Sequence, residues 1–475
     1  MASFSSYITF VLVLPFLLFS NVSMSQSIIK TLPGFSGDLP FKLETGYIGV
    51  GESERVQLFY YFIESERSPK DDPLVLWLTG GPGCSALSGL IYEIGPFTFN
   101  YANSSGYKPT LMLNPYSWTK VASFIFLDQP VGTGFSYSTT SDGYYIGDIS
   151  SAAQTSEFIR KWLTNHPEFL TNPLYIAGDS YSGMTVPVIL QDLSNGTEIG
   201  QQPPPLNIQG YILGNPFTDV KYDLNSRIIF AHRKALLSNS LYQSTKRNCK
   251  GEYMRPDPTN AACLSDLQAV TRCLNKINNP QVLEPKCNTL SPKPKRSKWD
   301  HSSLAESSLD AILSTPKAAD GPWCRNYNYL LSYIWANDKT VQRALHVRKG
   351  TIKQWERCNT SLCYGHDLIS SIDYERNLTK KNYRALIYSG DHDMVIPFVG
   401  TQEWIESLGL PVSDDWKPWY VDGQVAGYVI YTVTYAEKKY TLTYVTVKGP
   451  GHTAPEYKPK ECLAMIDRWF AHFPL

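Results

Sequence analysis

The feature that most constrains the fold is a short apolar run that ends in a serine flanked by small residues. Residues 174–177 are apolar, and Gly178-Asp-Ser-Tyr-Ser-Gly183 follows them directly. A sharp turn from a strand into a helix needs small residues, because the backbone there is strained and neighbouring chains pass close to it. The segment therefore predicts a buried strand that ends in a nucleophile elbow, with the Ser180 hydroxyl at the carboxyl end of the strand. An ordinary serine turn is the alternative, so this interpretation depends on partners later in the chain.

Further apolar runs extend the pattern along the chain. The runs that predict buried strands are residues 74–78, 124–127, 208–213 and 385–388. Continuous apolar runs are typical of strands that are covered on both faces. A helical pattern at residues 152–163 lies between two of them, so the rhythm predicts a mostly parallel sheet with helices on its faces, an α/β fold. Alternation at 56–62 predicts antiparallel strands, late strands are expected at 428–435 and 441–447, and a helix at 461–470 closes the chain.

The chain changes character between residues 218 and 324, where it becomes polar. The cysteines of this region are Cys249, Cys263, Cys273, Cys287 and, at its edge, Cys324. We interpret the region as an insertion that folds over the carboxyl edge of the sheet, between core segments at residues 26–217 and 325–475. A basic stretch at 293–298 within it is either a proteolytic processing site or a solvated loop. The core is expected to resume with a helix that begins near Asn337, a plausible N-cap.

The first residues and the cysteines point to the secretory pathway. Residues 1–25 predict a signal peptide, because the apolar run at 8–19 is too short to span a bilayer and small residues follow it. Nine cysteines fit an oxidising compartment, and their odd number leaves at least one thiol unpaired. Candidate glycosylation sites are Asn103, Asn195, Asn359 and Asn377. We therefore expect a soluble vacuolar or extracellular protein once the signal peptide is removed.

Charge and cysteine spacing exclude several classes of protein. Lysine plus arginine and aspartate plus glutamate number 43 each, so no global charge draws the chain to nucleic acid or to an anionic membrane. No Cys-x-x-Cys or His-x-x-x-His spacing occurs, which argues against a zinc site.

Three residues of suitable chemistry each follow the end of a predicted strand, in the order Ser180, Asp393 and His452. A serine hydroxyl is a poor nucleophile until an imidazole accepts its proton, and the imidazole needs a carboxylate to fix its tautomer and stabilise its charge. A lone histidine after a strand is usually structural, but His452 lies in a loop of small residues at the required position. The order serine, acid, histidine is that of α/β-hydrolases. We favour Asp393 over Asp391 because the acid of these enzymes typically lies three residues after the glycine that ends the strand.

A second requirement is a pair of amides for the developing oxyanion. The elbow supplies the N–H of Tyr181, and the glycine-rich loop Thr79-Gly-Gly-Pro-Gly-Cys-Ser85 supplies the other, which we assign to Gly81. A tight turn is the plain alternative for this loop, and it lacks the spacing of a phosphate-binding loop.

Four motifs together resemble those of the serine carboxypeptidase family. They are Thr79-Gly-Gly-Pro-Gly-Cys-Ser85, Asp128-Gln-Pro-Val-Gly-Thr-Gly-Phe-Ser-Tyr137, Gly178-Asp-Ser-Tyr-Ser-Gly183 and Gly451-His-Thr-Ala-Pro455. The likeness covers essentially the whole mature chain. More narrowly, the chain is similar to the plant serine carboxypeptidase-like acyltransferases, which pass an acyl group from a 1-O-β-glucose ester to an alcohol.

The resemblance implies an α/β-hydrolase core with a largely helical insertion. It also implies disulfide bonds, which map here as Cys84–Cys358, Cys249–Cys263 and Cys287–Cys324. Cys273, Cys363 and Cys462 are then left free. No metal or organic cofactor is implied, because the glucose ester is itself the activated species.

Departures from the peptidase pattern favour the acyltransferases. In the peptidases an asparagine, the glutamate before the nucleophile and a further glutamate bind the terminal carboxylate of the peptide, and the positions here hold Thr79, Asp179 and Glu93. Threonine offers one hydroxyl where asparagine offers two amide donors, and aspartate is a methylene shorter than glutamate. Each buried group left unpaired costs about 1–3 kcal/mol. His392 in Gly390-Asp-His-Asp-Met394 is also more like the acyltransferases.

The leading hypothesis is therefore an acyltransferase whose partners are an acyl glucose and an alcohol acceptor. Ser180 carries the acyl group, and Thr79, Glu93 and Asp179 contact hydroxyl groups of donor or acceptor. The alternative is a serine carboxypeptidase that resolves the same acyl-enzyme with water. A non-catalytic companion subunit is the third hypothesis, because Pro450 is atypical and its fixed φ constrains where His452 can lie. The identity of donor and acceptor and the oligomeric state are left open.

Overall fold

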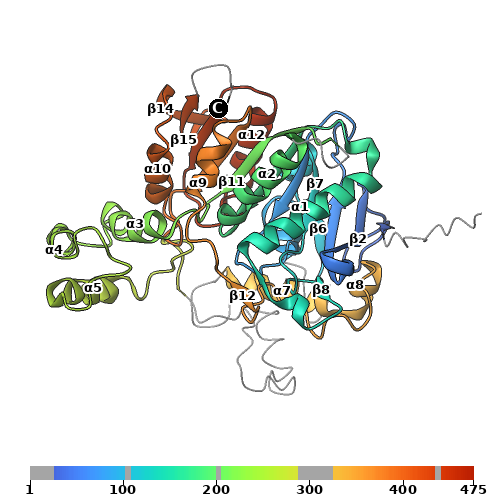
Figure 1. Ribbon diagram of the computed structural model, residues 1–475, viewed down its shortest axis with the longest axis horizontal. Coiled ribbons are helices and arrows are strands. Elements are labelled where there is room, and N and C mark those ends of the chain that lie inside the picture. The colour runs from blue at the N-terminus through green and yellow to red at the C-terminus, as the bar shows by residue number, and fades with distance from the viewer. Residues whose placement is uncertain (1–25, 102–108, 199–204, 287–324, 434–439) are drawn as a thin grey trace, which may run out of the picture.

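The predicted parallel sheet forms the centre of the molecule (Figure 1). The computed structural model describes residues 26–101, 109–198, 205–286, 325–433 and 440–475. Its parallel strands, in spatial order, are β7 (Ser123–Leu127), β4 (Leu74–Leu78), β10 (Leu174–Asp179), β11 (Ile208–Gly214), β13 (Arg384–Gly390) and β16 (Thr441–Val447). Every apolar run that predicted a buried strand lies in one of them, because both faces of these strands are covered.

Antiparallel strands extend the sheet at both ends. Beside β7 lie β3 (Val56–Ile63), β2 (Leu43–Val50) and β1 (Ser27–Ile29), and beside β16 lie β15 (Gln424–Val433) and β14 (Val412–Val421). A short strand, β8 (Tyr137–Ser138), pairs with β3. Two small sheets pair β5 (Phe97–Phe99) with β6 (Leu111–Leu113) and β9 (Ile146–Gly147) with β12 (Tyr364–Gly365).

The two late strands were predicted, and a third strand beside them was missed. β16 has the predicted bounds, and β15 covers most of the expected strand at 428–435, of which residues 434 and 435 lie outside the described residues. β14 was missed, because it is an exposed edge strand whose residues 413–415 are polar rather than apolar.

Helices cover both faces of the sheet. One face carries α1 (Asp148–Asn165), α2 (Ser182–Glu198), α9 (Ile372–Leu378) and α10 (Phe398–Ser407). The other face carries α7 (Asn326–Asn337), α8 (Lys339–Ala344), α11 (Ala454–Tyr457) and α12 (Pro459–Phe470). The helices predicted at 152–163 and 461–470 are parts of α1 and α12. This arrangement confirms the α/β class.

A helix begins near Asn337 as expected, but Asn337 is not its N-cap. Asn337 is the last residue of α7, and Asp338 is the N-cap of α8. The Asp338 carboxylate accepts hydrogen bonds from the N–H groups of Thr340 and Val341, which lack partners in the first helical turn. The Asn337 side chain instead donates to the carbonyl of Trp355. The capping signal was therefore assigned one residue too early.

The region expected as an insertion contains α3 (Val220–Arg233), α4 (Asn239–Cys249) and α5 (Ala261–Leu274) within its described part. α4 and α5 pack together as a hairpin that projects away from the sheet, at the left of Figure 1. The predicted disulfide Cys249–Cys263 closes this hairpin. A small hydrophobic core joins it to the rest through Phe230 of α3 and Val399 of α10.

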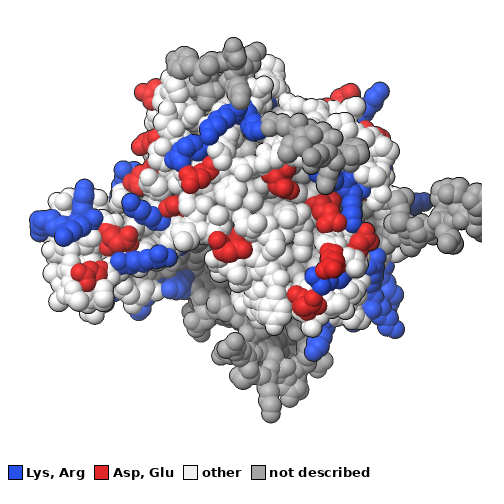
Figure 2. Space-filling model, viewed as in Figure 1, with Lys and Arg blue, Asp and Glu red and all other residues white. Residues whose placement is uncertain are grey.

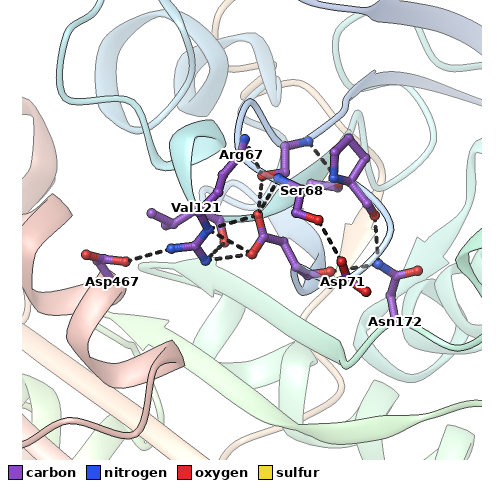
Figure 3. A network of polar contacts seen from close by, with 10 residues as sticks. Arg67, Ser68, Asp71, Val121, Asn172 and Asp467 are labelled. Carbon is purple, nitrogen blue, oxygen red and sulfur yellow. Dashed lines mark hydrogen bonds and ion pairs between the residues drawn. The ribbon is translucent and has the colours of Figure 1, made fainter.

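A polar network ties the connection between β3 and β4 to α12 (Figure 3). The Asp72 carboxylate is 6% exposed and accepts hydrogen bonds from the Ser65 hydroxyl at 2.6 Å and the Ser68 N–H at 3.0 Å. The Arg67 guanidinium binds both Asp72 oxygens at 2.6 to 3.2 Å and reaches Asp467 of α12 at 3.4 Å. A carboxylate with this many donors is held in one place, so the network fixes the loop that leads into β4.

Several predictions fall outside the described residues, namely the signal peptide at 1–25, Asn103 and the basic stretch at 293–298. Within the described ranges, no helix is both long and apolar enough to cross a membrane. Acidic and basic side chains are interspersed over the face shown in Figure 2, in keeping with their equal numbers.

Candidate active site

Ser180 lies at the sharp turn between β10 and α2, at the carboxyl end of the parallel strands. Its backbone φ is 54°, in the left-handed region that residues with a side chain rarely adopt. The Ser180 N–H donates to the carbonyl of Gly214 in β11 at 2.9 Å. The Ser180 carbonyl accepts from the N–H groups of Gly183 at 3.0 Å and Phe217 at 2.8 Å. The turn therefore has the geometry of a nucleophile elbow.

The structure brings Ser180, His452 and Asp393 together, although they are far apart along the chain. The Nε2 atom of His452 lies 2.8 Å from the Ser180 hydroxyl oxygen. The Nδ1 atom of His452 lies 2.7 Å from Oδ2 of Asp393. With Nδ1 donating to the carboxylate, Nε2 is left to accept the proton of the serine hydroxyl. This is the arrangement that activates a serine for attack on a carbonyl.

The charges around His452 favour its protonated form. Burial alone lowers the pKa of the imidazole, but the charge and hydrogen bond of Asp393 outweigh burial, so the pKa of His452 is raised. Asp179 adds to the rise, and the positive charge of Arg227 opposes it. The imidazole is therefore set up to accept a proton.

The carboxylate of Asp393 is fully buried and well supplied with donors. It accepts hydrogen bonds from the Asn215 side chain at 3.0 Å and from the N–H groups of Val395 at 2.7 Å and Ile396 at 3.2 Å. These donors hold the carboxylate in the position from which it orients the imidazole. Asn215 was not singled out from the sequence.

Asp391 does a different job from Asp393. Its Oδ1 atom accepts from Nδ1 of His392 at 2.6 Å and from the N–H of Gly449 at 2.7 Å. Asp391 therefore holds the loop that leads to His452 and does not contact the imidazole of His452 itself. The geometry supports the choice of Asp393 over Asp391 as the acid that acts with Ser180 and His452.

Pro450 does not displace His452 from Ser180. Its carbonyl accepts a hydrogen bond from the N–H of His392 at 2.9 Å. The proline therefore takes part in the contact between the loop that carries Asp393, which we name the acid loop, and the loop that carries His452, which we name the histidine loop. The neighbouring Gly449 has φ 100°, which places the turn before the proline.

The glycine-rich loop after β4 approaches the elbow closely. A Cβ atom added to Gly80 would lie 2.6 Å from the nitrogen of Tyr181 and 2.7 Å from Cβ of Ser180, so only glycine fits there. The N–H groups of Gly81 and Tyr181 form no hydrogen bond to another described residue. Both amides therefore remain available to an atom bound beside Ser180.

The carboxylate of Asp128 holds this loop in place through hydrogen bonds. It accepts from the Ser85 hydroxyl at 2.7 Å, the Ala86 N–H at 2.8 Å and the Phe135 N–H at 2.9 Å. Burial raises the pKa of Asp128 to about 6, although these three bonds lower it. The motif that begins at Asp128 thus supports the glycine-rich loop through the carboxylate of its first residue.

A cavity of about 270 Å³ opens beside Ser180 and His452. Its walls include the three residues predicted to bind substrate, Thr79, Glu93 and Asp179. Burial raises the pKa of Asp179 to about 6, against the effect of His452. Burial, together with the charge of Asp179, raises the pKa of Glu93 well above its usual value. Two carboxyl groups that both resist ionisation therefore face the cavity.

Several polar atoms in this cavity wall are buried and have no partner among the described residues. They are Oγ1 of Thr79, Oε2 of Glu93 and Nε of Arg357. The guanidinium of Arg357 lies over the ring of Tyr329 at 4.0 Å. Buried polar groups usually have partners, so these three atoms indicate a polar ligand. Arg357 was missed from the sequence, because an arginine in a loop carries no pattern of its own.

The cysteines and glycosylation sequons can be placed in part. The disulfides Cys84–Cys358 and Cys249–Cys263 form as predicted, and Cys287 and Cys324 lie outside the described residues. The cysteines expected to be unpaired, Cys273, Cys363 and Cys462, are free. Asn195 and Asn377 are exposed on helices, whereas the side chain of Asn359 donates to the carbonyl of Gly132 at 2.9 Å.

Comparison with known proteins agrees with this geometry. Residues 33–472 match the family model described as Serine carboxypeptidase. Serine carboxypeptidase-like 7 of Arabidopsis thaliana is 48% identical over 468 residues, which cover 98% of this chain and 98% of that protein. Serine carboxypeptidase-like 16 of Arabidopsis thaliana is 49% identical over 455 residues, 96% of each chain.

Among solved structures, the chain resembles that of Kex1(delta)p, a prohormone-processing carboxypeptidase from Saccharomyces cerevisiae. The TM-score is 0.71, the sequence identity is 20%, and the match covers 94% of this chain and 95% of that one. At this identity the likeness bears on the fold, and the predicted α/β-hydrolase fold is confirmed.

Proposed function

The chain belongs to the serine carboxypeptidase family of enzymes, and on this basis we propose that it is an acyltransferase of plant secondary metabolism. It moves an acyl group from a 1-O-β-glucose ester to an alcohol through an acyl-enzyme on Ser180. The observation that carries the proposal is the polar wall beside Ser180, where Thr79 and Asp179 replace the residues with which the peptidases hold a terminal carboxylate. This wall offers fewer donors to a carboxylate and leaves Oγ1 of Thr79 without a partner.

In the first half-reaction the Ser180 oxygen attacks the ester carbonyl while Nε2 of His452 accepts the hydroxyl proton. The oxygen of the tetrahedral intermediate accepts hydrogen bonds from the N–H groups of Gly81 and Tyr181. The intermediate collapses as the bond to the glucose oxygen breaks, and His452 returns the proton to the departing glucose. Asp393 stabilises the imidazolium that exists between these two steps.

In the second half-reaction the alcohol takes the place of glucose. Nε2 of His452 accepts the proton of the acceptor hydroxyl as its oxygen attacks the acyl carbonyl, and Ser180 leaves with that proton restored. Burial and the charge of Asp179 raise the pKa of Glu93, which favours its protonated form. A neutral carboxylic acid both donates and accepts hydrogen bonds, as sugar and alcohol hydroxyls do. Glu93 and Asp179 therefore suit the hydroxyl groups of donor or acceptor.

The disulfides fit an oxidising compartment, lumenal or extracellular. Within that range we place the enzyme in the vacuole or outside the cell. Acidic surroundings would keep Glu93 and Asp179 protonated, since both pKa values are raised.

A serine carboxypeptidase is the second candidate, and Arg357 favours it. Its guanidinium lines the cavity, where a cation can bind the terminal carboxylate of a peptide. In that case water resolves the acyl-enzyme. A non-catalytic companion subunit is the third candidate, and the 2.8 Å contact between His452 and Ser180 argues against it.

The test is to mix the purified, glycosylated protein with a galloyl or hydroxycinnamoyl glucose and a set of plant alcohols. We expect a transferred ester that is absent with Ser180→Ala. Release of glucose without transfer, in the presence of suitable acceptors, contradicts the proposal. Removal of C-terminal residues from a blocked dipeptide at a higher rate than transfer supports the peptidase. Failure of Ser180 to react with a fluorophosphonate in folded protein supports the companion subunit.

A further inference from the structure

The chain that follows α5 crosses directly over the two loops that carry Asp393 and His452. It comprises residues 279–282, which we name the strap. The strap belongs to the region expected as an insertion, yet its neighbours Asn278 and Glu284 line the same cavity as Ser180. None of its residues was singled out from the sequence.

The strap binds the acid loop through two backbone hydrogen bonds. The carbonyl of Asn279 accepts from the N–H of Met394 at 2.8 Å, and the N–H of Val282 donates to the carbonyl of His392 at 3.1 Å. These bonds fall on the two residues that flank Asp393. The position of the acid is therefore set from the strap on both sides.

The strap also binds the histidine loop. The carbonyl of Pro280 accepts from the N–H of His452 itself at 2.8 Å, and Nε2 of Gln281 donates to the carbonyl of Gly449 at 2.8 Å. The approach is so close that a Cβ atom added to Gly451 would lie 1.9 Å from the Pro280 oxygen. Glycine before the histidine is thus required by the strap.

Gln281 is the side chain that holds the strap in this shape. It is 4% exposed, and its Oε1 accepts from the N–H of Leu283 at 3.2 Å while its Nε2 reaches Gly449. Just beyond, Glu284 accepts from Arg325 at 2.6 Å, which anchors the chain to the start of α7. A buried amide that satisfies both its donor and its acceptor in this way fixes one conformation.

A second contact from the same region also supports the acid loop. Arg227 of α3 donates from two guanidinium nitrogens to the carbonyl of Val395, at 3.0 and 2.7 Å. The N–H of Val395 in turn donates to Oδ1 of Asp393 at 2.7 Å. The acid loop is therefore held by hydrogen bonds from both α3 and the strap.

We propose that the strap is a positioning element of the active site, in which Gln281 sets the separation of the loops that carry Asp393 and His452. Gln281 touches neither Ser180 nor the imidazole, so it acts through the loops and not on the substrate. A displacement of about 1 Å in such a set of groups is enough to cost up to about a hundredfold in rate. The inference depends on serine chemistry at Ser180 but not on the identity of the acyl donor or acceptor.

The charged groups that face His452 determine what a shift of the strap does to its titration. Asp393 and Asp179 raise the pKa of His452, and Arg227 and burial lower it. If the two loops separate, the contribution of Asp393 weakens and the pKa of His452 falls. The acid limb of the pH–rate profile, where the rate falls because His452 becomes protonated, then moves to lower pH for any reaction that uses His452 as a base.

The experiment compares Gln281→Met with Leu283→Ala in the full-length protein. Methionine keeps the buried volume and removes both amide hydrogen bonds, whereas Leu283 is 73% exposed and lies outside the cavity wall. The probe is a fluorophosphonate, and the rate constant for labelling Ser180 is measured per active molecule as a function of pH. With Gln281→Met we expect labelling about 10- to 100-fold slower, an acid limb at lower pH and faster amide exchange at His452 and Met394. With Leu283→Ala we expect wild-type labelling within about twofold.

Labelling by Gln281→Met within about twofold of the wild type, with the same acid limb, overturns the inference. Slower labelling with unchanged acid limb and unchanged amide exchange also overturns it, because the loops then have not moved. A lower melting temperature alone does not count in its favour, since the rate constant refers to folded enzyme. The labelling needs no acyl glucose, so a failure here is separate from a failure of the proposed transferase activity.

Discussion

The charges next to His452 act in opposite directions, and their balance decides how the site responds to pH. Asp393 contributes through both its charge and its hydrogen bond, and it outweighs the burial that lowers the pKa of the imidazole. Asp179 acts in the same sense from the cavity side, 5% exposed. Asp393 and Asp179 therefore differ in position: Asp393 binds the imidazole, and Asp179 lines the cavity.

Asp393→Asn is expected to lower kcat/KM for acyl transfer by about ten-thousandfold, because the amide no longer fixes the tautomer or stabilises the imidazolium. The pKa of His452 falls, because Asp393 no longer outweighs the burial that lowers it, so the acid limb of the pH–rate profile moves to lower pH. A pH–rate profile of the variant measures both effects. Asp391→Asn is the comparison variant, and we expect a much smaller effect from it, because the Asp391 carboxylate holds the loop at Gly449 and does not bind the imidazole of His452. An acid limb unmoved by Asp393→Asn would contradict the assignment.

Thr79 and Asp179 are expected to decide between transfer and peptide cleavage. The double substitution Thr79→Asn with Asp179→Glu restores the donors with which the peptidases hold a terminal carboxylate. We expect cleavage of a blocked dipeptide to rise at least about fivefold relative to acyl transfer, the equivalent of about 1 kcal/mol. The ratio of the two activities is measured with one enzyme preparation. An unchanged ratio would show that these positions do not set specificity.

Secondary-structure elements differ in how much of their position the sequence predicts. The strands β4 and β10 were predicted because burial on both faces demands a continuous apolar run, and the elbow because its turn demands small residues. β14 and the strap were missed for a different reason. An edge strand exposed to solvent has no apolar pattern, and the strap contacts the active site mainly through backbone carbonyls and amides that any residue possesses. The arginines Arg227 and Arg357 were missed because a charged residue signals nothing until its neighbours are known.

The two disulfides hold different elements and should have different effects. Cys84–Cys358 spans 274 residues and ties the loop that carries Gly81 to the segment of Arg357, with supporting backbone bonds on either side. Replacing both cysteines with serine is expected to cost about 2–5 kcal/mol of folding free energy and to slow fluorophosphonate labelling of Ser180.

The matched control is the same replacement at Cys249–Cys263. This bond spans 14 residues within the projecting α4–α5 hairpin. We expect it to lower the melting temperature while labelling of Ser180 stays at the wild-type rate. Equal effects of the two replacements on labelling would contradict the view that only Cys84–Cys358 supports the glycine-rich loop that carries Gly81.

Several buried acids, spread over the described part of the molecule, have raised pKa values. Burial raises the pKa of Asp128 to about 6, of Asp223 to about 7 and of Glu375 to about 8. These groups belong to different parts of the fold, so their effect is global. In the folded state each binds its proton more tightly than in the unfolded chain, and stability therefore falls as pH rises between the two pKa values. Each of these three groups therefore contributes more to stability at acidic pH than at neutral pH.

Glu375 offers the clearest test of this view. It lies on α9, hydrogen-bonded to Tyr211, which also contacts Tyr440, and its ordinary pKa is 4.5. Between pH 4.5 and 8 we expect the wild type to lose on the order of 3–5 kcal/mol through this group. Urea unfolding across that range should show a flatter dependence on pH for Glu375→Gln. An identical slope in the two proteins would contradict the raised pKa.

The acyl group itself gives the most direct view of the proposed chemistry. The protein is exposed briefly to a panel of 1-O-acyl glucoses, and the peptide that contains Ser180 is examined by mass spectrometry before and after an alcohol is added. We predict the mass of the acyl group on Ser180, with glucose released, and its transfer to the alcohol when acceptor is present. A protein that reacts with a fluorophosphonate at Ser180 but takes up no acyl group, or whose acyl group passes only to water, would contradict the proposal.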